Sequence, residues 1–333
     1  MVEQWRRGVE EAAAVLGTRA TRDAPLGART TYRVGGPAAL LVEVSGLADL
    51  ELAGRAVRAG GVPVLVVGRG SNLLVADAGF RGLAVVMAEG LDRIELDAGS
   101  GRVRAGGAAS LPVLARRAAA AGLGGLEWSV GVPGSVGGAV RMNAGGHGSD
   151  IAASLVRVGL VDLAADPAAD PATDPATDPA ADPGPGGEAG QHEVPAGGLQ
   201  LGYRSSAVTP TQVVTWAEFT VGPREVRDAE AEVAAIVAWR RANQPGGQNA
   251  GSIFTNPPGD SAGRLIEAAG VKGLSRGSAT VSSKHANFVQ AGAGGSADDV
   301  FRLALEVRRR VEDASGVRLD LELRLVGFDG DGR

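Results

Sequence analysis

The segment PVLVVGRGSNLLV, residues 63–75, joins an apolar run to a turn rich in glycine. Residues 63–67 are typical of a buried strand. In the turn that follows, Gly68, Gly70, Ser71 and Asn72 leave a run of main-chain N–H groups unencumbered. Such a turn can approach a pyrophosphate closely and donate hydrogen bonds to it. A simple tight turn between two strands is the alternative interpretation.

A second glycine cluster, GVPGSVGGAVRMNAGG, occupies residues 131–146. Its glycine content predicts neither a helix nor an ordinary strand. Neither cluster has the G-x-G-x-x-G pattern that opens a helix in dinucleotide folds, and there is no G-x-x-x-x-G-K-[ST] motif. Two such loops in one chain therefore indicate a long phosphate-containing ligand that is held at two places.

Outward from these loops, strand and helix patterns divide the chain into three zones, at residues 1–88, 89–222 and 223–327. The first zone alternates strands and helices, the second is rich in strands and glycine, and the third opens with a helix. Capping residues mark the helix ends, with Ser45 and Ser296 as N-caps and Gly316 after the last helix. The expected strands are 39–44, 63–67, 83–87, 93–96, 103–105, 154–163 and 212–221, and the expected helices are 47–59, 111–121, 224–241 and 297–314.

One segment has no pattern of either kind. Residues 166–183 repeat Asp-Pro every four residues, and the run continues through PGPGGEAG. Proline at this spacing excludes a helix interior or a sheet centre, and few large apolar side chains are available for burial. We expect residues 164–193 to form a disordered or extended loop at a hairpin tip, with a partner-docking polyproline tract as the alternative.

Composition excludes several classes of protein. The net charge of −5 and pI near 5.4 argue against non-specific nucleic-acid binding. No apolar run approaches the length of a membrane span, and the N-terminal stretch lacks the apolar core of a signal peptide. The absence of cysteine excludes disulfides and thiolate metal sites and suits a cytoplasmic protein. We therefore expect a globular cytoplasmic protein, with no metal site, that binds neither membranes nor nucleic acid.

The segment AGSIFTNP, residues 250–257, contains a serine that serine-hydrolase chemistry does not explain. Ser252 lacks a G-x-S-x-G motif, and none of the three histidines is in a setting that marks a triad base. A serine active here would therefore donate a proton rather than attack. That role requires a strongly basic intermediate such as a carbanion or an enolate.

Eight motifs in order along the chain closely resemble the UDP-N-acetylenolpyruvoylglucosamine reductase (MurB) family. The resemblance implies an α+β fold, with a two-lobed FAD-binding unit of the vanillyl-alcohol-oxidase (PCMH) type and a smaller α+β C-terminal substrate domain. The short interval between Arg204 and Ser252 resembles the compact type II form, which lacks a tyrosine loop over the substrate. The motifs are TTYRVGGPA (30–38), PVLVVGRGSNLLV (63–75), VGVPGSVGGAVRMNAGG (130–146), LGYRSS (201–206), AGSIFTNP (250–257), LIEAAGVKG (265–273), SSKHANFV (282–289) and LELRLVG (321–327).

The resemblance also implies the reaction and its residues. NADPH would reduce FAD, and the flavin N5 would deliver hydride to UDP-N-acetylglucosamine enolpyruvate, giving UDP-N-acetylmuramate for peptidoglycan. Ser252 would protonate the intermediate, while Arg204 and Glu322 would stabilise it. Tyr203, Asn256 and Lys272 would bind substrate. The implied cofactor-binding residues are Gly68, Gly70, Ser71, Asn72, Gly131, Pro133, Gly134, Ser135, Gly137, Gly138, Asn143, Ala144 and Gly145.

Some features depart from the family or admit other interpretations. GRGSN contains no histidine or cysteine, so we expect FAD to be bound non-covalently. Thr255 stands where the family often has lysine. Two rival functions are a related FAD-dependent sugar or hydroxy-acid oxidase or dehydrogenase, and a nucleotide-sugar binding protein that has lost its chemistry. The joint presence of Ser252, Arg204 and Glu322 disfavours both rival functions. We also expect the protein to be a monomer.

Overall fold

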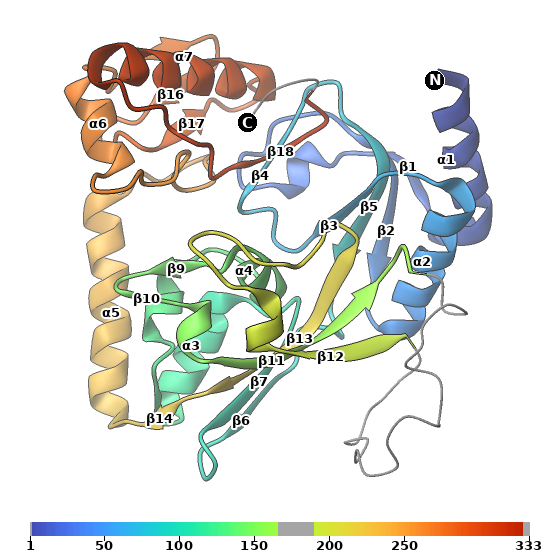
Figure 1. The fold of residues 1–333 in the computed structure, drawn as a ribbon, viewed down its shortest axis with the longest axis horizontal. Coiled ribbons are helices and arrows are strands. Elements are labelled where there is room, and N and C mark those ends of the chain that lie inside the picture. Colours follow the sequence, from blue (N-terminus) through green and yellow to red (C-terminus); the bar gives the residue numbers. More distant parts are fainter. Residues whose placement is uncertain (1, 166–189, 329–333) are drawn as a thin grey trace.

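The computed structural model describes residues 2–165 and 190–328. Three sheet-containing units surround a common centre, and one long helix runs along one side from the second unit to the third (Figure 1). Most of the Asp-Pro segment lies outside the described residues. The loop expected at 164–193 extended too far, because Gln191–Pro195 forms strand β12. That strand pairs antiparallel with β11 (Leu155–Asp162), which confirms the hairpin.

The first unit is a four-stranded sheet covered on one face by two helices. The strand order is β1 (Thr21–Ala24), β2 (Ala38–Val44), β5 (Phe80–Met87) and β3 (Val64–Val67). The last three strands are parallel, and β1 is antiparallel to β2. Apolar side chains of α1 (Val2–Leu16) and α2 (Leu47–Gly60) pack on this sheet. The strands expected at 39–44, 63–67 and 83–87 are confirmed.

The N-cap expected for α2 was wrong by one residue. Gly46 occupies that position, and no side chain caps the helix there. Instead, the Asp49 carboxylate in the first turn accepts a hydrogen bond from the main-chain N–H of Ser45 at 2.8 Å. The acidic residue thus satisfies a donor just before the helix, whereas a serine cap would have satisfied an N–H group of the first helical turn.

The second unit is a five-stranded antiparallel sheet. Its order is β12-β11-β13-β7-β6, where β13 is Gln212–Thr220, β7 is Arg102–Gly106 and β6 is Ile94–Asp97. The hairpin expected around residues 97–101 is confirmed, as is the helix expected at 111–121, α3 (Leu111–Ala120). The short elements here are η3 (Glu127–Gly131), β8 (Leu123–Gly124), β9 (Gly145–Gly146), β10 (Ser149–Asp150), η4 (Ile151–Ala153), η6 (Ala196–Leu199) and β14 (Gly222–Pro223).

The second glycine cluster contains a helix that the sequence did not predict. α4 spans Val136–Met142, and its N-cap Ser135 accepts a hydrogen bond from the N–H of Gly138 at 3.3 Å. The glycines allow close packing, since a Cβ at Gly137 would lie 3.1 Å from the carbonyl oxygen of Val214 on β13. Tertiary packing of the small helix on the sheet therefore outweighs the low helix propensity of glycine.

The third unit holds a three-stranded sheet, order β15-β16-β17, and two helices that pack with it. The predicted caps of its long helix are confirmed, with Ser296 at the N-cap and Gly316 at the C-cap. The elements are α6 (Ala262–Ala268), β15 (Ser275–Arg276), β16 (Ala279–Val281), β17 (Val289–Ala291) and α7 (Ala297–Ser315). The helix expected at 224–241 is α5 (Val226–Asn243), which packs on α3 and η3.

The third unit is attached firmly to the first. β18 (Arg324–Val326) pairs in parallel with β4 (Leu73–Val75), which directly follows the first glycine loop. The fully buried Tyr32 donates its hydroxyl to the carbonyl of Val289 at 3.1 Å. Burial raises the pKa of Tyr32 above the usual tyrosine range. The C-terminal strand is thus held beside the glycine loop.

Candidate active site

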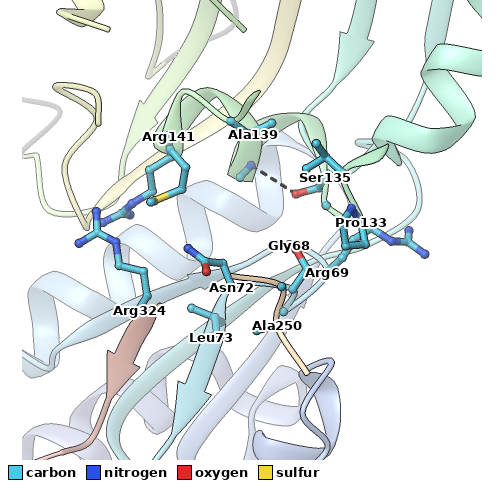
Figure 2. A pocket seen from close by; sticks show the side chains of 18 of the residues that line it. Gly68, Arg69, Asn72, Leu73, Pro133, Ser135, Ala139, Arg141, Ala250 and Arg324 are labelled. Atoms are coloured by element: carbon cyan, nitrogen blue, oxygen red, sulfur yellow. Dashed lines mark hydrogen bonds between the residues drawn. The ribbon is translucent and has the colours of Figure 1, made fainter. Parts of the chain in front are cut away.

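A cavity of about 390 Å³ lies where the three units meet. Both glycine loops line it, together with the segment around Ser252 and strand β18 (Figure 2). The sequence-predicted residues that line it are Gly68, Gly70, Ser71, Asn72, Gly131, Pro133, Gly134, Ser135, Gly138, Ala144, Gly145, Arg204, Ser252 and Glu322.

The first glycine loop presents main-chain donors to the cavity. Within the described part of the chain, no atom accepts a hydrogen bond from the main-chain N–H groups of Arg69, Gly70, Ser71 or Asn72. Consecutive free N–H groups of this kind form an anion-binding concavity. Gly70 has φ +62°, and a Cβ there would lie 2.4 Å from the carbonyl oxygen of Arg29, so only glycine fits.

The second glycine loop faces the first at close range. A Cβ on Gly68 would lie 2.1 Å from the hydroxyl oxygen of Ser135. The absence of that Cβ leaves room for the two loops to approach each other. Free main-chain donors on one loop and a glycine-lined wall on the other fit the pyrophosphate of FAD.

Arg204 and Glu322 form an ion pair in the cavity. Arg204 Nε donates to Glu322 Oε1 at 2.7 Å, and its Nη2 donates to the carbonyl of Gly145 at 2.9 Å. Arg204 has φ +54°, a left-handed conformation that is uncommon for a non-glycine residue. These contacts fix the guanidinium while its Nη1 bonds to no atom among residues 2–165 and 190–328.

A main-chain hydrogen bond next to Ser252 joins its segment to the same pair. The N–H of Glu322 donates to the carbonyl of Ile253, the residue after Ser252, at 2.9 Å. The side-chain amide of Asn72 donates to the carbonyl of Glu322 at 3.1 Å. No described residue bonds to the Ser252 hydroxyl. Ser252 thus stands beside Glu322 and the first glycine loop with its hydroxyl available to a ligand.

The environment of Glu322 shifts its ionisation. Burial raises the pKa of the Glu322 carboxyl above its ordinary value, while the charge of Arg204 and its hydrogen bond oppose that change. Because the net direction is upward, Glu322 takes up a proton more readily than an exposed glutamate. A raised carboxyl pKa in a cavity is characteristic of functional sites.

Five residues predicted for the site do not line the cavity: Gly137, Asn143, Tyr203, Asn256 and Lys272. The buried amide of Asn143 donates to the carbonyl of Gly202 at 2.9 Å and accepts from the N–H of Ala152 at 3.0 Å. It therefore positions the loop that carries Arg204.

The other three polar residues lie on exposed surface around the C-terminal unit. Tyr203 is 59% exposed, and its hydroxyl accepts from the main-chain N–H of Asn256 at 3.3 Å. Lys272 pairs with Glu267 at 3.0 Å. Substrate binding by these residues stays a prediction.

The structure also brings forward polar residues that the sequence reasoning missed. Arg240 and Gln244 lie one turn apart at the end of α5 and line the cavity, with Arg240 Nε donating to Gln244 Oε1 at 2.7 Å. Burial lowers the pKa of Arg240. Arg141 and Arg324 line it as well. The sequence gives no signal for Arg141, which lies in a helix that was not predicted. Arg324 has the pattern of a strand residue that faces solvent.

Residues 2–165 and 190–328 lack two kinds of feature. They contain no helix long and apolar enough to cross a membrane. They also hold no group of three acidic, histidine or cysteine side chains placed to bind a metal ion.

Comparisons with known proteins agree with this site. The sequence model for an FAD binding domain matches residues 38–165, and the model for the C-terminal domain of UDP-N-acetylenolpyruvoylglucosamine reductase matches residues 243–326. Fold and site together define an FAD-binding oxidoreductase with a mixed helix and strand fold and a separate C-terminal domain.

Individual relatives narrow the class to one family. The UDP-N-acetylenolpyruvoylglucosamine reductase of Anaeromyxobacter sp. (strain Fw109-5) is 40% identical, over 97% of this chain and 92% of that protein. That of Rubrobacter xylanophilus is 39% identical, over 92% and 94%. The crystal structure of the reductase (MurB) from Thermus caldophilus has a TM-score of 0.74 at 33% identity and covers 92% of this chain and 99% of that one. The chain belongs to the UDP-N-acetylenolpyruvoylglucosamine reductase family, as its motifs predict.

Proposed function

We propose that this chain catalyses the NADPH-dependent reduction of UDP-N-acetylglucosamine enolpyruvate to UDP-N-acetylmuramate, a step in peptidoglycan precursor synthesis. The observation that carries the proposal is the convergence of Ser252, Arg204 and Glu322 on the cavity that the FAD loops line. A flavin oxidase would need the loops, but it would not need a proton donor beside an arginine–glutamate pair. Family membership supports the same substrate.

Each of the three residues has a role that suits its contacts. Bound FAD supplies hydride transfer, from NADPH to the enolpyruvyl double bond. Arg204, fixed by Glu322 and Gly145, provides a planar cation for the substrate carboxylate and for the charge that develops next to it. The Ser252 hydroxyl donates a proton to the carbon that becomes electron-rich, because an enolate is basic enough to take it. Tyr203, Asn256 and Lys272 bind the UDP portion, in a protein that works as a cytoplasmic monomer.

The visible spectrum of the purified protein tests this proposal. We expect a yellow protein that NADPH bleaches without oxygen and that recovers its colour when UDP-N-acetylglucosamine enolpyruvate is added. Mass spectrometry should then find UDP-N-acetylmuramate. If a sugar or a hydroxy acid bleached the flavin and the enolpyruvyl compound did not restore it, the oxidase alternative would replace this function.

A further inference from the structure

Two arginines converge in the cavity from opposite walls. Arg141 projects from α4 and Arg324 from β18, and their guanidinium groups meet near Asn72 (Figure 2). Burial lowers the pKa of Arg141, and the nearby charge of Arg324 lowers it further. The two cations therefore lie within electrostatic range of each other.

No carboxylate in the described part of the chain neutralises this pair. Arg141 Nη1 donates only to the carbonyl of Thr209, at 3.2 Å, and the Arg324 side chain forms no hydrogen bond or ion pair there. Glu322, two residues from Arg324, is already bonded to Arg204. Two like charges held together in a cavity are unfavourable unless an anionic group joins them.

The place of the pair identifies that anion. α4 lies within the second glycine loop, and the main-chain N–H of Arg324 donates to the carbonyl of Asn72 in the first loop at 3.0 Å. The carbonyl of Arg141 accepts the hydroxyl of Ser206, two residues after Arg204, at 2.7 Å. The pair thus lies where the FAD loops meet the residues proposed for catalysis, which is where the reactive ring of FAD belongs.

We propose that Arg141 and Arg324 bind the negative charge that FAD gains on reduction and thereby raise its reduction potential. A hydride carries two electrons and one proton, so its transfer from NADPH gives NADP⁺ and a reduced flavin with one additional negative charge. Cations beside the ring favour this reduced form over the oxidised form. The inference rests on FAD binding and refines the proposed function, but its test needs no enolpyruvyl substrate.

The test compares reduction potentials of the FAD-loaded protein. Arg141→Gln and Arg324→Gln each remove one cation, while Arg141→Lys and Arg324→Lys retain it. We expect each Gln substitution to reduce the preference of the protein for reduced over oxidised FAD by about tenfold. This change lowers the reduction potential of a two-electron couple by about 30 mV. The Lys variants should stay close to the unmodified protein. Arg227→Gln is the matched control, because Arg227 is exposed on α5 and does not line the cavity.

Each outcome of the reduction-potential test either supports or overturns the proposed role of Arg141 and Arg324. A lowered potential in both Gln variants, with the potential of Arg227→Gln unchanged, supports the proposal. An unchanged potential with a raised KM for the enolpyruvyl substrate would assign the pair to a substrate anion and overturn it. Equal weakening of oxidised and reduced FAD would also overturn it. If Arg141→Gln lowers the amount of folded protein, the exposed Arg324 gives the same test alone, with Arg324→Lys as its control.

Discussion

Ser252 offers a hydroxyl to the cavity without any protein partner among the described residues, as a proton donor to substrate should. In Ser252→Ala, NADPH should bleach the flavin at close to the normal rate. Oxidation of the reduced flavin by the enolpyruvyl substrate should slow by about 10²–10⁴-fold, because positioned proton transfer is worth that much. Stopped-flow absorbance of the two half-reactions measures both rates.

Two further variants test the role of Ser252 against a general disturbance. Ser252→Cys, with a more acidic thiol, should recover part of the lost rate. Ser283→Ala is the matched control, since Ser283 is exposed and does not line the cavity. Equal slowing of flavin reduction and reoxidation in Ser252→Ala would remove Ser252 from the donor role and leave it as a turn residue.

The raised pKa of Glu322 predicts a pH dependence with a definite sign. Above that pKa the carboxylate is ionised and holds Arg204, whereas below it the proton weakens the ion pair. The rate of flavin reoxidation should therefore fall with decreasing pH, with a midpoint above the ordinary glutamate value of 4.5. Glu322→Gln should lower the rate and abolish this acid limb. An unchanged limb in that variant would assign the titration to another group.

Single residues show how far sequence reaches into the site. Ser252, Arg204 and Glu322 could be predicted as site residues because each lies in a motif that the family shares, and all three line one cavity. Asn143 lies in such a motif too, but its side-chain amide forms hydrogen bonds with the main chain of Gly202 and Ala152. Arg240 was missed because a cation at the end of a helix usually meets solvent, and only the packing of α5 turns it toward the cavity.

At the scale of elements, the start of α7 links the first and third units. The Asp77 carboxylate, in the turn after β4, accepts hydrogen bonds from the hydroxyl of Ser296 and from the N–H of Ala297, the latter at 2.9 Å. An acceptor at a helix N-terminus typically contributes about 1 kcal/mol. Asp77→Ala should lower the free energy of unfolding by about 1–2 kcal/mol in urea titrations followed by circular dichroism.

The same helix offers the control for this prediction. Asp313, in its last turn, forms an exposed pair with Arg309. Asp313→Ala should change stability by no more than about 0.5 kcal/mol, because exposed pairs contribute little. Equal effects of the two substitutions would mean that Asp77 acts as a general surface charge and does not join the units.

The hairpin of β11 and β12 predicts tolerance to shortening. Its register is fixed by the strands themselves, with Val161 opposite Gln191 on either side of residues 166–189. Replacing residues 166–189 by a six-residue Gly-Ser link should leave kcat and Tm nearly unchanged, since the entropy of loop closure varies slowly with length. A large loss of turnover with an unchanged Tm would show that the segment contributes to the site.

Elements with local signals were predictable, and those formed by packing were not. Ser296 and Gly316 define the ends of α7 within the sequence, and the structure has them as its caps. No local signal marks α4, because its glycines disfavour a helix. The helix forms because Gly137 packs closely against the carbonyl oxygen of Val214 on the sheet. The parallel pairing of β18 with β4 joins residues about 250 positions apart, which no local pattern specifies.

At the scale of the whole molecule, the cavity joins units with separate apolar cores, so FAD should stabilise all of them together. A ligand at 1,000 times its Kd contributes about 4 kcal/mol to stability. Mild denaturation should release FAD from the chain, since GRGSN offers no histidine or cysteine for a covalent bond. The protein without FAD should show a clearly lower Tm.

Riboflavin should restore little of the lost Tm, because riboflavin lacks the pyrophosphate that the N–H groups of residues 69–72 would bind. Gly70→Ala, whose Cβ would meet the carbonyl of Arg29, should abolish the stabilisation by FAD. Flavin that remains on the unfolded chain, or full rescue by riboflavin, would contradict a pyrophosphate-anchored, non-covalent cofactor.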